Sequence, residues 1–339
     1  MLRVARSGQF LDGPEAVAFE AQLELWLGRE VRAVTCASGS EALVLALKAL
    51  DVQAGDEVVV PAFTFAATAE AVVHLGAVPV FADVGPDGLL DRTCIEPCLT
   101  SRTRAVVFVS LFGQVPDLEV LGPWLEAQGI GWLEDGAQSF GARRNGRLSC
   151  TFGLATTSFF PGKPLGAWGK GGAVFAKNPV QAARLRALRN HGQAERGVHD
   201  EVGWNSRMDE MQAAVLRLKL EMFPEELAIR RSLASLYRAE LPGAAKRLFQ
   251  QDACESSWSQ FTVRLQDRGA VRERFQRAGI PSAIHYAVPL HLQPAFAAWK
   301  PERALPMAEA LSREILSLPL HPWLTQDDVR AVCRELERE

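Results

Sequence analysis

Residues 31–83 read VRAVTCASGSEALVLALKALDVQAGDEVVVPAFTFAATAEAVVHLGAVPVFAD, and this stretch decides the fold. Short apolar runs alternate in it with helical patterns of apolar residues. The expected elements are, in order, a strand, a helix, a strand, a helix and a strand at Val31–Cys36, Glu41–Leu50, Glu57–Pro61, Ala66–Leu75 and Val78–Asp83. Strands separated by helices predict a mostly parallel sheet covered on both faces, so we expect an α/β fold.

The alternation continues outward from this stretch. Further strands are expected at Arg104–Leu111, Ile130–Asp135, Val174–Ala176 and Gln260–Leu265. Further helices are expected at Leu118–Gln128, Pro179–Asn190, Met208–Arg238, Ala270–Ala278, Pro306–Leu316 and Thr325–Glu339. The pattern becomes more helical after Gly172, and we expect a large domain over residues 1–225 and a smaller α/β domain over residues 226–339.

The composition narrows the class of protein. Of 339 residues, 48% are hydrophobic and 23% are charged, and the formal net charge of -3 argues against a nucleic-acid surface. The longest stretch without Asp, Glu, Lys or Arg, Ala278 to Trp299, contains three prolines, which argues against a membrane helix. The residues after Met1 do not resemble a signal peptide, so none is expected, and the six dispersed cysteines are expected to be reduced thiols in a cytoplasmic protein.

The turn Ser38-Gly39-Ser40 lies between a predicted strand and a predicted helix. Its small residues expose backbone N–H groups at the positive end of the helix, which suits a phosphate group. Serine is also a favoured N-cap residue, so a purely structural cap is the alternative.

Asp135 lies in Glu134-Asp135-Gly136-Ala137-Gln138, directly after an apolar run. A carboxylate at a buried strand end is costly unless a cation or hydrogen bonds compensate it. The protonated ring nitrogen of a pyridine cofactor is one such cation. A helix-capping aspartate is the alternative.

Lys163 follows Ser158-Phe159-Phe160-Pro161-Gly162 and precedes a glycine-rich run that ends at Gly172. A lysine in such a Pro/Gly loop is held by its surroundings. If it is desolvated, its pKa falls and the neutral amine can form a Schiff base. The alternative is an ordinary solvated lysine.

Two further segments are candidates for ligand binding. Arg207 can grip a carboxylate or phosphate with two hydrogen bonds, and Asn205 can bind a phosphate. A helix cap with a surface salt bridge is the alternative for both. The pair His285-Tyr286 lacks further ligands at regular spacing, so no metal site is expected.

In this order the segments resemble the DegT/DnrJ/EryC1/StrS family of sugar-nucleotide aminotransferases. The likeness covers nearly the whole chain. It rests on Gly13-Pro14-Glu15, Ser38 to Leu43, Gly55 to Pro61, Glu134 to Gln138, Ser158 to Lys163 and His191 to Gln212. The resemblance implies a fold type I enzyme that depends on pyridoxal phosphate (PLP), with a large PLP-binding domain and a smaller C-terminal α/β domain.

The resemblance implies a role for each residue that would contact the cofactor ring. Lys163 corresponds to the lysine that carries the cofactor and later moves the proton. Asp135 corresponds to the carboxylate that keeps the pyridine nitrogen protonated. Gln138 corresponds to the partner of the ring hydroxyl, and Phe65 to the aromatic residue that stacks on the ring.

The resemblance also implies a phosphate site and a substrate site. Ser158 and the backbone of Gly39, Ser40 and Glu41 correspond to the phosphate cradle. Asn205 corresponds to a residue that reaches the phosphate from the other subunit, which implies a homodimer with shared active sites. The residues that fall where family members contact substrate are Arg207, His285 and Tyr286.

The stretches Ser139 to Ala142, Ser158 to Gly166 and Lys219 to Phe223 resemble one branch in particular. That branch transfers an amino group to UDP-2-acetamido-2-deoxy-3-oxo-glucuronate for bacterial surface polysaccharide, which implies L-glutamate as the donor. The alternatives are another 3-oxo or 4-oxo UDP or dTDP sugar, a sugar 3-dehydratase and a non-catalytic PLP-binding regulator. The dehydratases carry a histidine in place of the lysine, so Lys163 argues against them.

Two positions depart from the family pattern. Lys170 stands where relatives usually carry an acidic residue, and Gly136 replaces the usual alanine after the aspartate.

Overall fold

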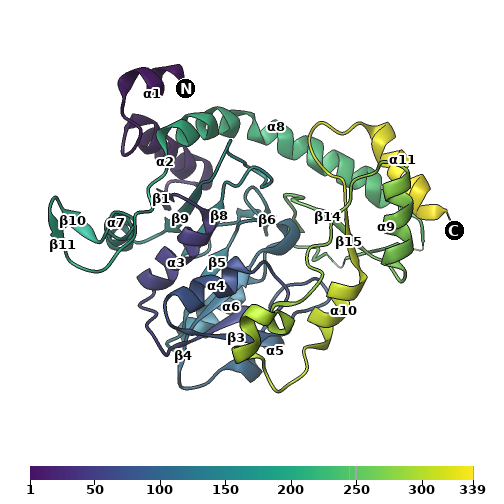
Figure 1. Ribbon diagram of the computed structural model, residues 1–339, viewed down its shortest axis with the longest axis horizontal. Helices are drawn as coiled ribbons and strands as arrows, with labels where there is room; N and C mark the ends of the chain where they lie inside the picture. Colours follow the sequence, from purple (N-terminus) through teal and green to yellow (C-terminus); the bar gives the residue numbers. More distant parts are fainter. Residues whose placement is uncertain (244, 249, 339) are drawn as a thin grey trace.

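A seven-stranded sheet forms the centre of the computed structural model, which describes residues 1–243, 245–248 and 250–338 (Figure 1). Its strand order is β1-β9-β8-β5-β4-β2-β3. The strands are β1 Arg32–Cys36, β2 Glu57–Pro61, β3 Val78–Ala82, β4 Thr103–Val109, β5 Gly131–Asp135, β8 Ala155–Ser158 and β9 Gly172–Ala176. Strand β9 is antiparallel to both of its neighbours, and the other pairs are parallel, which confirms the mostly parallel sheet.

Helices cover both faces of this sheet (Figure 1). They are α1 Leu2–Ser7, α2 Pro14–Leu27, α3 Gly39–Ala49, α4 Ala67–His74, α5 Arg92–Ile95, α6 Leu118–Glu126 and α7 Pro179–Leu188. Alternate residues of β9 enter different hydrophobic clusters: Val174 joins one, and Ala173 and Phe175 join the other. Because successive side chains of a strand point to opposite faces, both faces of the sheet are buried.

The long helix α8, Glu210–Glu240, connects this sheet to a second, smaller one (Figure 1). Its first half packs in a cluster of the large sheet through Phe223, and its second half packs in a third cluster through Tyr237. The smaller sheet contains β12 Lys246–Arg247, β14 Phe261–Arg264 and β15 Ile315–Leu318, with α9 Arg268–Arg277 and α11 Gln326–Glu337 against it. The division at residues 225 and 226 falls inside α8 and stays a prediction.

The chain returns to the large sheet between α9 and β15. This return contains the 3-10 helices η3 Leu290–Leu292 and η4 Pro294–Trp299 and the helix α10 Pro306–Glu314. The N–H of Leu290 donates a hydrogen bond to the carbonyl of Ala62, just beyond β2, at 2.7 Å. Phe296 and Leu311 are buried in a cluster of the large sheet. The segment before η3 is therefore held near the carboxyl ends of the parallel strands.

Three expectations about elements are corrected. The helix expected at Pro306–Leu316 ends at Glu314, because Leu316 and Leu318 are buried opposite Val263 and Phe261 in β15. The N-terminal helices α1 and α2 were not among the expected elements. The last helix ends at Glu337, and Glu339 lies outside the described residues.

Short elements complete the fold. They are η1 Glu96–Cys98, η2 Leu111–Gly113, β6 Arg143–Arg144, β7 Arg147–Leu148, β10 Gln193–Glu195, β11 Val198–His199 and β13 Cys254–Glu255. In the part of the chain that the structure describes, no helix has the length and apolar character needed to cross a membrane.

Candidate active site

Asp135 ends strand β5, where its side chain is buried and only 6% of the residue is exposed. One carboxylate oxygen accepts a hydrogen bond from the hydroxyl of Thr68 and the other from the N–H of Ala137, both at 3.1 Å. Burial raises the pKa of this carboxyl, while these hydrogen bonds and the charge of Lys163 oppose the rise. The site therefore favours a cation beside Asp135.

Lys163 lies in the loop that follows β8. Its N–H donates to the carbonyl of Phe160 at 2.8 Å, and the N–H of Ala167 donates to the carbonyl of Phe159 at 2.8 Å, so the loop is closed on itself. Burial lowers the pKa of the Lys163 amine, and the charge of Asp135 opposes this shift. A lowered pKa raises the fraction of neutral amine, which is the nucleophilic form.

His285 and Tyr286 join these two residues from the segment before η3. The phenol oxygen of Tyr286 accepts a hydrogen bond from the side-chain N–H of Gln138 at 2.9 Å, and the Gln138 side-chain oxygen accepts one from the N–H of Phe112 at 2.8 Å. Nδ1 of His285 lies 3.0 Å from the hydroxyl of Ser317. These residues thus come from four separate parts of the chain.

The charges of Lys163 and Asp135 act on the other residues of this site. Burial and the charge of Lys163 lower the pKa of His285. Burial and the charge of Asp135 raise the pKa of Tyr286, while its bond with Gln138 acts in the opposite direction. We call Asp135, Gln138, Lys163, His285 and Tyr286 the Lys163 cluster.

Phe65 lies at the open side of this cluster. Its ring centroid is 6.1 Å from that of Tyr286, and 54% of the residue is exposed. Phe63, which is fully buried, contacts Tyr286 at 6.2 Å in an edge-on arrangement. The exposed ring of Phe65 therefore has a free surface on which a planar ligand can stack.

The start of α3 shows the cap considered for Ser38-Gly39-Ser40, and the phosphate role stays a prediction. The hydroxyl of Ser38 caps the helix by accepting the N–H of Glu41 at 3.2 Å. The N–H groups of Gly39 and Ser40 are at the first positions of the helix and have no intrahelical acceptor. A Cβ on Gly39 would overlap the side chain of Ser158, so glycine lets Ser158 lie against the helix start.

Asn205 and Arg207 lie outside the Lys163 cluster. Asn205 is exposed, and Arg207 donates to Asp12 at 2.9 Å and to Asn205 at 3.1 Å. The intervening Ser206 is buried and donates to the carboxylate of Glu41 at 2.9 Å, which places the segment beside the start of α3. Within the part of the chain that the structure describes, Arg207 makes no hydrogen bond or ion pair with the cluster, so its substrate role stays a prediction.

Three partners of the cluster are missed by sequence reasoning: Thr68, Phe112 and Ser317. Thr68 follows the loop after β2, two strands away from β5 in the sheet. Carboxyl ends of parallel strands share one edge, and this rule gives the only sequence signal for Thr68. The other two depend on a backbone N–H and on the late strand β15, neither of which has a motif.

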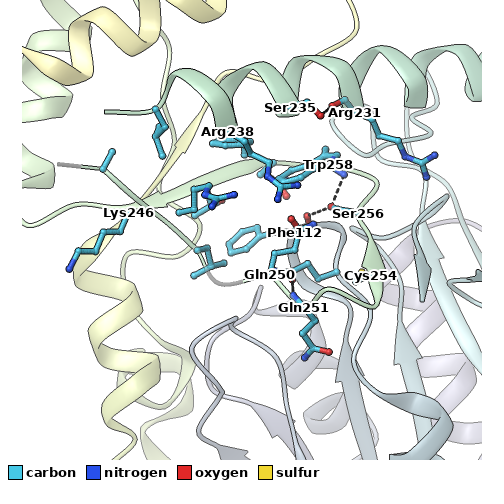
Figure 2. A pocket seen from close by; sticks show the side chains of 18 of the residues that line it. Phe112, Arg231, Ser235, Arg238, Lys246, Gln250, Gln251, Cys254, Ser256 and Trp258 are labelled. Atoms are coloured by element: carbon cyan, nitrogen blue, oxygen red, sulfur yellow. Dashed lines mark hydrogen bonds between the residues drawn. The ribbon is translucent and has the colours of Figure 1, made fainter. Parts of the chain in front are cut away.

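A cavity of about 900 Å³ lies between the second half of α8 and the smaller sheet (Figure 2). Arg231, Arg238 and Trp258 line it, and Figure 2 shows the ring of Phe112 among them. No residue of the Lys163 cluster lines this cavity. Phe112 is the link between the two places, because its backbone N–H binds Gln138.

The whole chain is similar to one protein family. The model of the DegT/DnrJ/EryC1/StrS aminotransferase family matches residues 1–337. The UDP-2-acetamido-2-deoxy-3-oxo-D-glucuronate aminotransferase of Pseudomonas aeruginosa is 41% identical, over 98% of this chain and 93% of that protein. The dTDP-3-amino-3,4,6-trideoxy-alpha-D-glucose transaminase of Streptomyces venezuelae is 42% identical, over 95% and 86% of the two chains.

Solved structures are also similar to this chain over nearly its whole length. The crystal structure of S. venezuelae DesV in complex with a ketimine intermediate has a TM-score of 0.95 and 39% identity, covering 100% of this chain and 93% of that chain. The crystal structure of NtdA from Bacillus subtilis with the bound cofactor PMP has a TM-score of 0.90 and 26% identity, covering 99% and 80%.

Proposed function

The chain belongs to the DegT/DnrJ/EryC1/StrS aminotransferase family, and we propose that it transfers an amino group from L-glutamate to UDP-2-acetamido-2-deoxy-3-oxo-D-glucuronate. It is a PLP-dependent transaminase that acts on nucleotide-linked keto sugars. The product would serve the synthesis of bacterial surface polysaccharide. The similarity to the P. aeruginosa enzyme supports this substrate, and the names of both relatives refer to carbon 3 of the sugar.

The residues present fit PLP. The buried carboxylate of Asp135 suits a protonated ring nitrogen, because a cation there offsets its desolvation. The exposed face of Phe65 suits the ring, and the N–H groups at the start of α3, which lack an intrahelical acceptor and lie beside Ser158, suit a phosphate. When bound, PLP supplies an electron sink that stabilises negative charge at the carbon that loses its proton.

The single observation that carries the proposal is the placement of Lys163 with Asp135. Burial lowers the pKa of the Lys163 amine, so that its Nζ can take up a proton and later return it. Asp135 holds a negative charge near this amine without a hydrogen bond to it among the described residues. The carboxylate is thereby left available to the ring nitrogen.

His285 and Tyr286 would orient the substrate beside Lys163. The lowered pKa of His285 keeps its ring neutral near neutral pH, so it adds no second positive charge beside Lys163. The raised pKa of Tyr286 keeps its phenol protonated, and Gln138 fixes the position of the phenol oxygen. Both side chains can therefore donate or accept hydrogen bonds to sugar hydroxyls at fixed positions.

We further propose a homodimer in which Asn205 reaches the cofactor phosphate of the other subunit. Asn205 is exposed beside the start of α3, and in its own chain its side-chain oxygen accepts a hydrogen bond from Arg207 at 3.1 Å. Large apolar side chains are exposed on neighbouring elements, a feature that supports an interface. They are Val17 and Leu25 of α2, Leu218 and Met222 of α8, and Trp168.

The substrate proposal is tested by incubating the PLP-loaded protein with glutamate and a panel of sugars. The panel contains 3-oxo and 4-oxo sugars linked to UDP and to dTDP, and mass spectrometry detects the amino sugar together with 2-oxoglutarate. Turnover of the UDP-linked 3-oxo uronate above all others is expected. Turnover of 4-oxo sugars alone would overturn the proposal.

The second candidate is transamination of a dTDP-linked 3-oxo hexose. The 42% identity with the S. venezuelae transaminase and the TM-score of 0.95 with DesV favour it. The same panel separates the two, because the candidates differ in both the nucleotide and the sugar carboxylate.

A further inference from the structure

The loop that carries Lys163 is bound by a lysine of another element. Nζ of Lys219, on α8, donates a hydrogen bond to the backbone carbonyl of Gly166 at 2.6 Å. Lys219 is half-buried, unlike the exposed Lys170 of the same glycine-rich run. A charged donor makes a stronger hydrogen bond than a neutral one, so this contact is more than an incidental surface approach.

Hydrogen bonds within the loop hold its tip, as from the N–H of Lys163 to the carbonyl of Phe160. Phe160, Pro161 and Gly162 are exposed, whereas the residues that follow Lys163 are buried. A Cβ on Gly166 would overlap the carbonyl of Pro161, so the backbone after Lys163 packs directly on the backbone before it. Any displacement of Gly166 is therefore transmitted to Pro161, on the opposite side of Lys163.

The position of Lys219 couples the loop to a buried hydrophobic cluster. Leu216 and Leu220, on the same helix, are buried in one cluster with Leu165 and Phe159 of the loop. Apolar packing fixes the loop laterally but leaves backbone carbonyls unsatisfied, and Lys219 satisfies the one at Gly166. The hydrogen bond and the apolar contacts thus act on neighbouring residues from the same helix.

We propose that Lys219 is a positioning residue that holds the Lys163 loop in the position required for proton transfer. It acts through the Gly166 carbonyl and touches neither the cofactor nor the substrate. The inference rests on the proposed role of Lys163. It also gives a use to the stretch Lys219 to Phe223, which the sequence singles out and which the Lys163 cluster leaves unexplained.

The test compares Lys219→Met, which removes the donor, with Lys219→Arg, which retains a charged donor of similar length. Lys48→Met, on α3, is the matched control, because Lys48 is also a half-buried lysine on a helix. In the PLP-loaded protein, hydrogen exchange is measured on peptides that cover residues 159–167. The kcat and KM for glutamate and the pH titration of the cofactor absorbance are measured in parallel.

We expect Lys219→Met to accelerate exchange in residues 159–167 and to lower kcat about tenfold, with KM nearly unchanged. The titration of the absorbance should shift, and Lys219→Arg should restore all three readouts. Lys48→Met should behave as the wild type. Wild-type exchange and wild-type titration in Lys219→Met would overturn the proposal.

A second variant covers the case in which Lys219→Met does not fold. Lys219→Leu also removes the donor and keeps a high helix propensity, so the same directions of change are expected. Wild-type behaviour of this variant would also overturn the proposal. Borohydride labelling of Lys163 in the wild type is an independent check. Absence of the label contradicts the proposed function, whereas the exchange data report only on the contact between Lys219 and Gly166.

Discussion

The Lys163 cluster and the segment Asn205–Arg207 are both predicted from sequence to serve one active site. In the folded chain they differ in their exposure and in their hydrogen-bond partners. The cluster is assembled within one chain and bonds internally, as in the contact of Gln138 with Tyr286. The segment lies at the surface, where Asn205 is exposed and Arg207 pairs with Asp12. The side chains of the cluster thus contact one another, whereas the segment Asn205–Arg207 lies at the surface.

Desolvation explains the contrast. Burial shifts the pKa of Lys163 down and that of Asp135 up, and both shifts suit the roles proposed for these two groups. The Arg207–Asp12 pair is partly exposed, with 49% of the Asp12 side chain accessible, and such pairs contribute little to stability. An incoming anion can therefore replace Asp12 at little cost.

Removal of the central amine has the largest expected effect. We expect Lys163→Ala to lower the rate of the glutamate half-reaction by about 10⁴-fold, because no other described lysine is buried beside Asp135. Stopped-flow absorbance measures this rate, and borohydride followed by peptide mass spectrometry shows whether residue 163 is labelled. The exposed Lys300 provides the control variant Lys300→Ala. A reducible linkage that survives in Lys163→Ala would contradict the assignment.

Neutralising the carboxylate beside Lys163 has the next largest effect. Asp135→Asn keeps the shape of the side chain and an oxygen for the Thr68 hydroxyl but removes the negative charge. We expect kcat to fall about 10²- to 10³-fold, in line with the loss of one electrostatic partner in an active site. Thr68→Val, which removes only the hydrogen bond, should cost less. Equal losses in the two variants would argue against a charge effect.

The outward-facing segment is tested by mixing subunits. Asn205→Ala should weaken PLP binding about tenfold, the cost of a hydrogen bond to a charged group. A mixture of Lys163→Ala and Asn205→Ala subunits, unfolded and refolded together, should show activity above the sum of the two parents, because one site of each mixed dimer is intact. Activity equal to that sum would show that Asn205 acts within its own chain.

The smallest expected effect concerns pH. Above its ordinary pKa of 6.5, His285 is neutral in both the folded and the unfolded chain and has no effect on stability. As the pH falls from 6.5 toward the lowered pKa of the folded state, the unfolded chain takes up the proton first, and the free energy of unfolding falls.

His285→Gln should remove this part of the decline in the cofactor-free protein, as measured by urea unfolding at several pH values. The pKa of His291 is lowered as well, so some decline should remain. His199→Gln, at an exposed histidine outside the cluster, is the matched control. An unchanged pH profile in His285→Gln would contradict the burial argument.

Most of the large sheet was predictable, because its strands and helices carry the two periodicities in clear succession. The predicted strand at Ile130–Asp135 appears as β5, and Asp135 stands at its end. The helix expected through Leu316 was wrong, because the three apolar residues among the four after Glu314 suit either a helix or a strand. Only the pairing with β14 decides between these, and that partner lies about fifty residues earlier.

Of the two positions that depart from the family pattern, Gly136 and Lys170, the structure explains only the first. A Cβ on Gly136 would overlap the sulfur of Cys150, which itself has a positive φ of 66°. Cys150, fourteen positions later in the sequence, therefore explains why glycine stands at position 136 instead of the usual alanine. Lys170 is exposed, and nothing in the structure explains its charge.

From the sequence by itself, local periodicity determined the fold class, the family resemblance implied the cofactor, and motifs at strand ends marked Lys163 and Asp135 as candidate site residues. Tertiary structure alone decided that Gln138 holds Tyr286, that Thr68 supports Asp135 and that Lys219 binds the Lys163 loop. Each of these contacts joins residues from separate elements. Their partners are chosen by distance and burial in the folded chain, which no local pattern records.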